Sequence, residues 1–110
     1  MAKKGWAAKP VRGLRSGRPI MALLDLLGRR WVLRILWELR DAALNFRALQ
    51  AACGGLSPSV LNQRLGELRA AELVELAADG YRLTHRGREL FNLFGPLNHW
   101  AERWAKTLAR

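Results

Sequence analysis

The chain has 110 residues, half of them hydrophobic, which is enough for one domain with one core and excludes a chain disordered throughout. The formal net charge of +10 is uneven, because residues 1–18 carry six cations and no acid while the remainder carries 13 cations against 9 acids. This excess favours a polyanionic partner, the alternative being a tail that only improves solubility.

Residues 1–18 combine their six cations with three glycines and one proline, and we interpret them as a flexible basic arm. Residues 19–110 then form the folded domain. No apolar run approaches the ~18 residues of a membrane span, and no apolar segment follows the N-terminal charges as it would in a secretory signal. We therefore expect no membrane association and a cytoplasmic location.

Two helices are predicted after the arm. Pro19 is suited to the first position of a helix and Gly28 to its end, and the apolar residues between them recur at spacings of three and four. A second helix is predicted over residues 29–40 with the same spacing. Leu33 and Trp37 add apolar surface on its other sides, so we expect this helix to lie at the centre of the core.

A helix-turn-helix is predicted next. Asn45 is suited to cap a short helix whose inner face includes Cys53, a residue we interpret as a small buried hydrophobe, with a redox role as the alternative. Gly54 and Gly55 make the turn. Ser57 then caps a helix that runs from Pro58 to about residue 71, and helix, glycine turn and helix together make the motif.

The face of this last helix opposite its leucines carries short and amide side chains, Ser59, Asn62, Gln63 and Gly66, with no acid until Glu67. Asn and Gln amides can pair bidentately with a base edge in the major groove of DNA. The face therefore indicates a recognition helix. The alternative is the solvated face of an ordinary helix.

A β-hairpin follows, because two short β-prone runs, residues 73–76 and 81–83, flank an Asp-Gly pair. Arg82 is expected on its exposed side. Two strands after a helix-turn-helix make a winged helix, so the predicted fold is mainly α with a small hairpin.

Thr84 is suited to cap the C-terminal helical region. Its apolar residues continue in one phase across Gly95 and Pro96, which predicts a single kinked helix. Such an apolar seam favours a homodimer formed through the terminal helices. The alternative is that the helix folds back on the first helix of its own chain. The seam consists of Leu90, Leu93, Leu97, Trp100 and Trp104.

In this order of elements the chain resembles the HxlR-type winged-helix transcriptional regulators of bacteria over about residues 19–104. Two motifs carry the resemblance together, a Gly-x-x-Trp helix and a Ser-Pro-x-Val-Leu-x-x-Arg-Leu run. The matching segments are Leu26–Leu36, Asn45–Leu49, Leu56–Leu68, Leu73–Glu75, Leu83–Gly87 and Trp100–Glu102.

The resemblance implies a homodimer that binds double-stranded operator DNA as a repressor or activator. It places Ser57 and Ser59 at the DNA backbone and Asn62 and Gln63 at bases. Arg64 would support the helix or touch phosphate, and Arg82 on the wing would contact the backbone or the minor groove. We add Arg47, on the outward face of the preceding helix, to this DNA-binding set.

Several positions depart from the family pattern. A cation is usual where Ser59 and Gly66 stand, which weakens phosphate attraction, and Arg18 occupies the position of the cysteine that electrophile-sensing members use. Thiol sensing is therefore not carried over, and the basic arm is expected to supply backbone contacts instead. A pocket for a small-molecule effector between the dimer helices and the core is compatible with the pattern, but no residue set identifies its ligand.

No catalytic or metal-binding constellation is present in the sequence. His85 and His99 are far apart, without a nucleophile or metal-ligand spacing near either, and Gly54-Gly55 lacks the Gly-Lys-Ser/Thr sequel of a phosphate loop. We therefore expect no enzyme activity and no cofactor. The competing function is a winged helix that binds nucleic acid without reading sequence, or binds protein.

Overall fold

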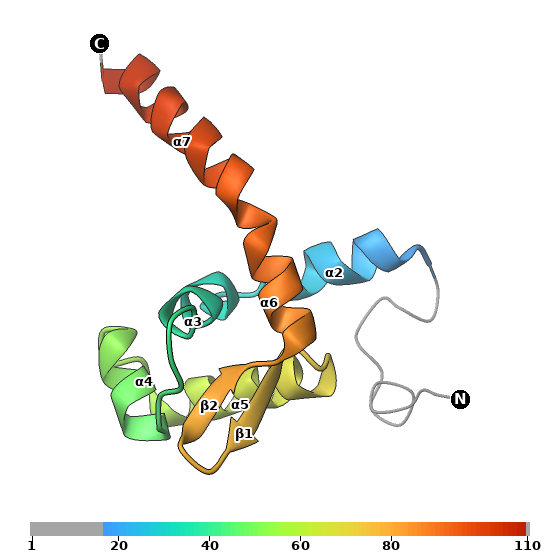
Figure 1. The fold of residues 1–110 in the computed structure, drawn as a ribbon, viewed down its shortest axis with the longest axis vertical. Helices are drawn as coiled ribbons and strands as arrows, with labels where there is room; N and C mark the ends of the chain where they lie inside the picture. The colour runs from blue at the N-terminus through green and yellow to red at the C-terminus, as the bar shows by residue number, and fades with distance from the viewer. Residues whose placement is uncertain (1–16, 110) are drawn as a thin grey trace.

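The computed structural model describes residues 17–109, so residues 1–16 of the predicted basic arm lie outside the described residues. Within that range the chain forms six helices and one antiparallel hairpin (Figure 1). This is the mainly helical winged helix-turn-helix that the sequence predicts. In chain order the elements are α2 (Pro19–Leu27), α3 (Val32–Glu38), α4 (Phe46–Ala52), α5 (Pro58–Ala70), β1 (Val74–Ala77), β2 (Gly80–Leu83), α6 (His85–Asn92) and α7 (Phe94–Ala109).

The turn between α2 and α3 corrects the predicted second helix. Helix α2 begins at Pro19 and is capped by Gly28, as predicted, but α3 begins at Val32 and not near residue 29. The reason is Trp31, whose backbone is left-handed with φ of 80° and therefore cannot continue a right-handed helix. Such a conformation is unfavourable for a bulky residue and needs support from its surroundings.

The helix-turn-helix of α4 and α5 has the predicted caps. The Asn45 Oδ1 atom accepts a hydrogen bond of 2.8 Å from the Ala48 backbone N–H, and Ser57 Oγ accepts one of 3.3 Å from that of Val60. Gly54 and Gly55 both have φ of 80°, a conformation that glycine adopts without steric penalty. Local sequence signals therefore determine where both helices start.

The hairpin is tighter than predicted and has a third partner. Ala77 pairs with Gly80, two residues that the sequence placed in the turn, so only residues 78–79 form the loop. Leu44 joins as an isolated bridge, because its N–H donates to the Tyr81 carbonyl at 2.9 Å and its carbonyl accepts from the Tyr81 N–H at 2.8 Å. A Cβ on Gly80 would lie 2.6 Å from the Leu44 carbonyl carbon, so this approach requires glycine.

The hairpin is fastened to α6 through Thr84, the single residue between β2 and α6. Its hydroxyl accepts from the Gly87 N–H at 2.9 Å and donates to the Glu72 carbonyl at 2.7 Å. Gly87 is buried against the residue preceding β1, because a Cβ there would lie 2.0 Å from the Leu73 carbonyl oxygen. The wing and the start of α6 are therefore in direct backbone contact.

The C-terminal region forms two helices where one kinked helix was expected. The interruption falls at Leu93, which caps α6, and α7 starts again at Phe94. Pro96 consequently occupies the first turn of α7, where its missing N–H removes no helical hydrogen bond. From there α7 projects away from the body of the domain (Figure 1).

The core is formed mainly by one side of α3 and the inner stripe of α5. Ile35 and Leu61 are fully buried, as are their helical neighbours Leu36, Leu65 and Leu68. Helix α3 lies at the centre of the core as expected, but it is not buried on most sides, because Leu33 and Trp37 are 49% and 47% exposed. This side of α3 is only partly covered, by Phe91 of α6, whose ring centroid is 5.9 Å from that of Trp37, and it faces the groove described below.

Candidate nucleic-acid interface

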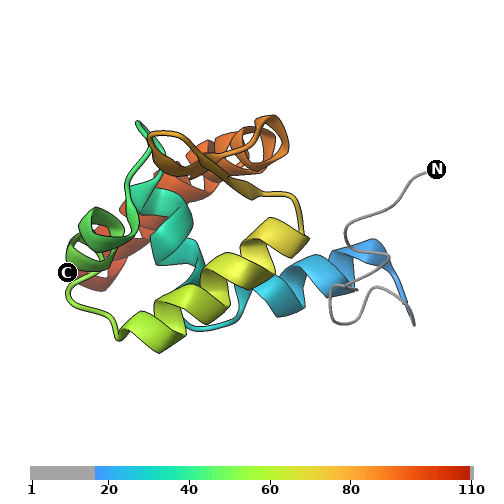
Figure 2. The ribbon, with the colours of Figure 1, turned by 90° about the horizontal axis from the view of Figure 1, so that it is seen from below.

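The outward face of α5 is formed as the sequence predicts. Ser59, Asn62, Gln63 and Gly66 are exposed, while Leu61, Leu65 and Leu68 anchor the opposite side in the core. Figure 2 shows α5 between the hairpin on one side and the α2–α3 turn on the other. The helix is therefore supported along both flanks, and its amide side chains are presented to solvent from a rigid element.

Two further predicted DNA-binding residues lie on the surface just before α5. Arg47 is exposed on α4, and Ser57 is exposed at the cap of α5, where its hydroxyl already accepts the Val60 N–H. A serine hydroxyl can still donate while it accepts a capping bond. The arrangement leaves Ser57 able to donate to a phosphate oxygen at the helix start, where backbone N–H groups also favour an anion.

Arg64 points away from the outward face of α5. Its Nε donates to the Arg30 carbonyl at 2.9 Å, and its Nη1 contacts the Glu67 carboxylate at 3.2 Å. Only 19% of the side chain is exposed. Of the two roles that the resemblance implied for Arg64, the contacts within the chain correspond to support of the helix.

Arg82 lies on the exposed side of the hairpin, as expected, but it has a partner there. Its Nε is 2.8 Å from Oε2 of Glu75 on β1, the residue directly opposite in the register, and both side chains are about half exposed. The hydrogen bond to this carboxylate raises the pKa of the Arg82 guanidinium. A phosphate contact from the wing would have to share Arg82 with Glu75, or displace that carboxylate.

The predicted apolar seam is exposed in the single chain. Leu97 is 61% exposed, and Trp100 and Trp104 are each 51% exposed with their rings stacked at a centroid distance of 5.6 Å. Leu93 is 70% exposed, whereas Leu90 is half-buried and packs against the core. The alternative of a fold-back onto α2 is not what the structure shows, since α7 extends away from the domain (Figure 1).

The seam continues into an apolar groove between α2, α3 and the start of α7, with a volume of about 520 Å³. Leu33 and Trp37, whose exposure the sequence did not predict, line it together with Leu24, Phe94 and Leu97. Excess apolar residues on other sides of α3 were the signal in the sequence. Their hydrophobicity alone predicts burial in the core, whereas in the structure Leu33 and Trp37 belong to a continuous exposed surface.

Cys53 is 1% exposed on the inner side of α4, which agrees with its predicted role as a small hydrophobe. Burial raises the pKa of its thiol, with a smaller opposing effect from Arg34. Both histidines are exposed, and residues 17–109 contain no cluster of three metal-ligating side chains. None of their helices is long and apolar enough to cross a membrane.

The sequence model of the HxlR-like helix-turn-helix family matches residues 26–109, more than three quarters of the chain. The chain belongs to this family. The observed order of helix-turn-helix, hairpin and C-terminal helices in this HxlR-like protein agrees with the resemblance that its motifs indicated.

Individual relatives agree with this assignment. The uncharacterized HTH-type transcriptional regulator YvaP of Bacillus subtilis is 32% identical over 88 residues, which cover 74% of this chain and 82% of that protein. Quinone-bound YodB, also from B. subtilis, is 31% identical with a TM-score of 0.72 and covers 76% and 96% of the two chains. A possible HxlR family transcriptional factor from Thermoplasma volcanium is 25% identical with a TM-score of 0.69, covering 82% and 87%.

This HxlR-like protein is accordingly a transcriptional regulator of the helix-turn-helix type, a class that binds DNA and is not enzymatic. In DNA-binding helix-turn-helix motifs the second helix lies in the major groove, and α5 occupies the position of that helix here. One set of polar contacts was not foreseen from the sequence, the links of Arg64 and Glu67 to the α2–α3 turn, because their partners are more than 30 residues away along the chain.

Proposed function

We propose that this HxlR-like regulator acts as a homodimer that recognises a specific operator in double-stranded DNA, with Asn62 and Gln63 as base readers. The observation that carries the proposal is the exposure of two amide side chains on one face of a helix anchored in the core. An amide can donate to and accept from a single adenine edge at once, which an aliphatic or acidic side chain cannot do.

The homodimer is supported by the exposed seam on α7 and the groove beside it. Trp100 and Trp104 expose aromatic surface that monomeric proteins rarely leave in contiguous patches, and Leu24, Leu33 and Trp37 extend this surface over α2 and α3. Reading two half-sites with one helix each is the usual arrangement for this motif. Pairing through α7 would leave the outward faces of both α5 helices open.

Replacing Asn62 and Gln63 together by alanine should reduce preference for the operator without unfolding the domain, because both side chains are exposed. A lost bidentate base contact corresponds to about 1–3 kcal/mol of discrimination. We expect the ratio of operator to random-duplex affinity to fall by at least about tenfold. Fluorescence anisotropy with an operator selected from a random duplex pool measures this ratio.

Asn92→Ala is the matched control, since it removes an exposed amide from α6 and should leave the ratio unchanged. An unaltered preference in the Asn62 and Gln63 variant would show that other side chains read the bases.

The competing function is a winged helix that binds nucleic acid generally, or binds protein. It is favoured by one observation: the outward face of α5 from Ser59 to Gly66 presents no cation, because Arg64 contacts Arg30 and Glu67. A specific dimer should prefer its operator over bulk DNA by a factor of about a thousand or more. Equal competition by random duplex would indicate a general binder, and no binding at low salt a protein partner.

We propose further that the basic arm supplies phosphate contacts. Deleting residues 1–17 removes five of its six cations. The affinity for every duplex should fall, and the slope of log K against log salt should flatten by about 0.9 for each lost phosphate contact. A titration between about 50 and 200 mM salt measures the slope, and an unchanged slope would place the arm away from DNA.

A small-molecule effector belongs to the same proposal. YodB, to which this chain is similar, has been observed with a quinone bound. In this chain the apolar groove beside Trp37 and Phe94 has a volume in the range of ligand pockets. Cys53 is buried and does not line this groove, so we expect such an effector to bind in the groove noncovalently.

A further inference from the structure

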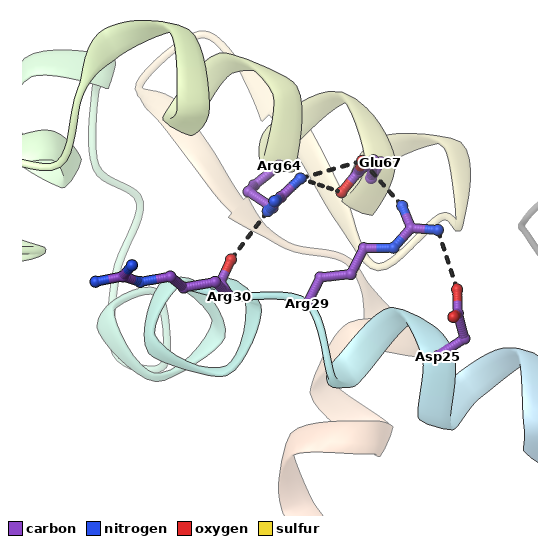
Figure 3. Close-up of polar contacts among 5 residues, drawn as sticks. All are labelled: Asp25, Arg29, Arg30, Arg64 and Glu67. Carbon is purple, nitrogen blue, oxygen red and sulfur yellow. Dashed lines mark hydrogen bonds and ion pairs between the residues drawn. The ribbon is translucent and has the colours of Figure 1, made fainter.

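A series of four charged side chains connects α5 to α2 across the turn between α2 and α3 (Figure 3). Arg64 contacts Glu67 one turn further along α5, at 3.2 Å. The other oxygen of Glu67 is 2.9 Å from Nη1 of Arg29, and Nη2 of Arg29 is 3.0 Å from the Asp25 carboxylate on α2. Arg64 also donates to the backbone carbonyl of Arg30, so it binds the turn directly.

These side chains lie in a partly buried layer, with exposed fractions between 19% and 27%. Water therefore screens their interactions less than those of a surface ion pair. The hydrogen bonding of this layer is incomplete, because Arg29 Nε is buried without a hydrogen-bond partner within the described residues. A partly buried ion network adds little to the free energy of unfolding, because the cost of removing its charges from water offsets their attraction. Its directional hydrogen bonds nevertheless restrict how the two helices can be oriented.

The contacts are placed where they fix the rotation of α5 about its own axis. Arg64 immediately follows the two amide residues, and its guanidinium is held on the inner flank by two differently directed partners, the Arg30 carbonyl and Glu67. The Arg30 carbonyl belongs to the turn that contains the left-handed Trp31, so both sides of the contact are conformationally restricted. Rotation of α5 would break these bonds and redirect Asn62 and Gln63.

We propose that Arg64, Glu67 and Arg29 are positioning residues for DNA recognition, which orient the amide face of α5 and do not themselves bind phosphate. This inference rests on the proposed sequence-specific function. Bidentate base contacts require donor–acceptor distances near 3 Å and good alignment at two atoms at once, so a small rotation of the helix removes them. Contacts to the backbone, which give general affinity, tolerate such a rotation better.

The variant Arg64→Lys distinguishes a positioning role of Arg64 from a direct phosphate contact. Lysine keeps the positive charge but lacks the planar fork that binds a carbonyl and a carboxylate in two directions. If Arg64 bound phosphate, Arg64→Lys would remain close to wild type. If Arg64 positions the helix, Arg64→Lys should lower the ratio of operator to random-duplex affinity by about tenfold while the salt slope stays unchanged.

Glu67→Gln gives an independent test with the opposite electrostatic expectation. Removing a negative charge near DNA should tighten binding to every duplex if charge alone matters. The positioning role predicts instead that the operator ratio falls about as much as for Arg64→Lys. The double variant should lose less than the sum of the two single losses, because both changes break the shared Arg64–Glu67 contact. Arg69→Lys, an exposed cation in the last turn of α5, is the matched control and should keep the ratio.

The measurement is anisotropy of the full chain with the selected operator and a scrambled duplex at four salt concentrations, with near-ultraviolet circular dichroism to verify folding of each variant. Tenfold loss of the ratio in both single variants with an unchanged slope supports the inference. A retained ratio in both would overturn it. So would a shallower salt slope for a third variant, Arg64→Gln, which removes the charge that a phosphate contact would need. A wild-type chain that shows no discrimination would instead reject the proposed function on which the inference rests.

Discussion

Replacing Trp104 by glutamate should convert the proposed homodimer of this HxlR-like regulator into a monomer. Trp104 is half exposed in the single chain and stacks on Trp100 at the C-terminal end of the seam. Truncating a tryptophan that is an interface hot spot weakens binding by about 2–4 kcal/mol, and a carboxylate in its place adds a desolvation penalty. The dissociation constant of the dimer should therefore rise by about a thousandfold or more.

Sedimentation velocity at micromolar concentration measures this change directly, and operator affinity should fall with it because only one half-site can be held at a time. His99→Glu is the matched control, since it introduces the same charge on the side of α7 away from the seam. A dimer that survives Trp104→Glu would place the interface elsewhere on the molecule.

Replacing Gly87 by alanine should destabilise the domain strongly. The added Cβ would lie 2.0 Å from the Leu73 carbonyl oxygen, a backbone atom that cannot move without disturbing the hairpin. Overpacking against a fixed group costs about 1–3 kcal/mol and occasionally more, which outweighs the gain of about 1 kcal/mol in helix propensity. For a domain of this size, each kcal/mol lost corresponds to a fall of about 4–8 °C in Tm.

Gly66→Ala is a control of the same chemistry with the opposite expected sign. Gly66 is also helical, but a Cβ there would meet nothing within 4 Å, so the variant should gain stability. Thermal unfolding followed by circular dichroism compares the two. A Gly87→Ala domain as stable as wild type would mean that the contact between α6 and the residue before β1 relaxes easily.

The parts of the fold that the sequence predicts are those encoded locally. The caps at Asn45, Ser57 and Thr84 are confirmed because a capping side chain bonds a backbone N–H three residues away. The exposure of Asn62 and Gln63 follows from the helical spacing of the leucines around them. Short-range rules therefore suffice to place the candidate reading face.

The features that sequence reasoning missed depend on distant partners. The Arg64 to Arg30 bond joins segments 34 residues apart, and the Leu44 bridge to Tyr81 is similarly remote. The left-handed Trp31 lies in the same turn that Arg64 reaches. The spacing of residues along a helix does not predict which distant backbone carbonyl an arginine side chain will contact. Leu33 and Trp37 show a related limit, because hydrophobicity indicates burial without telling whether the covering surface belongs to the same chain or to another.

The single-residue junction at Thr84 has a mechanical consequence for the assembled regulator. Since β2 passes into α6 without a flexible linker, and Gly87 packs that helix against the residue preceding β1, we expect a rotation of α6 to move the wing with it. We expect a twist between two paired subunits to swing both wings together. The separation and phasing of the two DNA half-sites would then be governed by the angle at which the paired C-terminal helices cross.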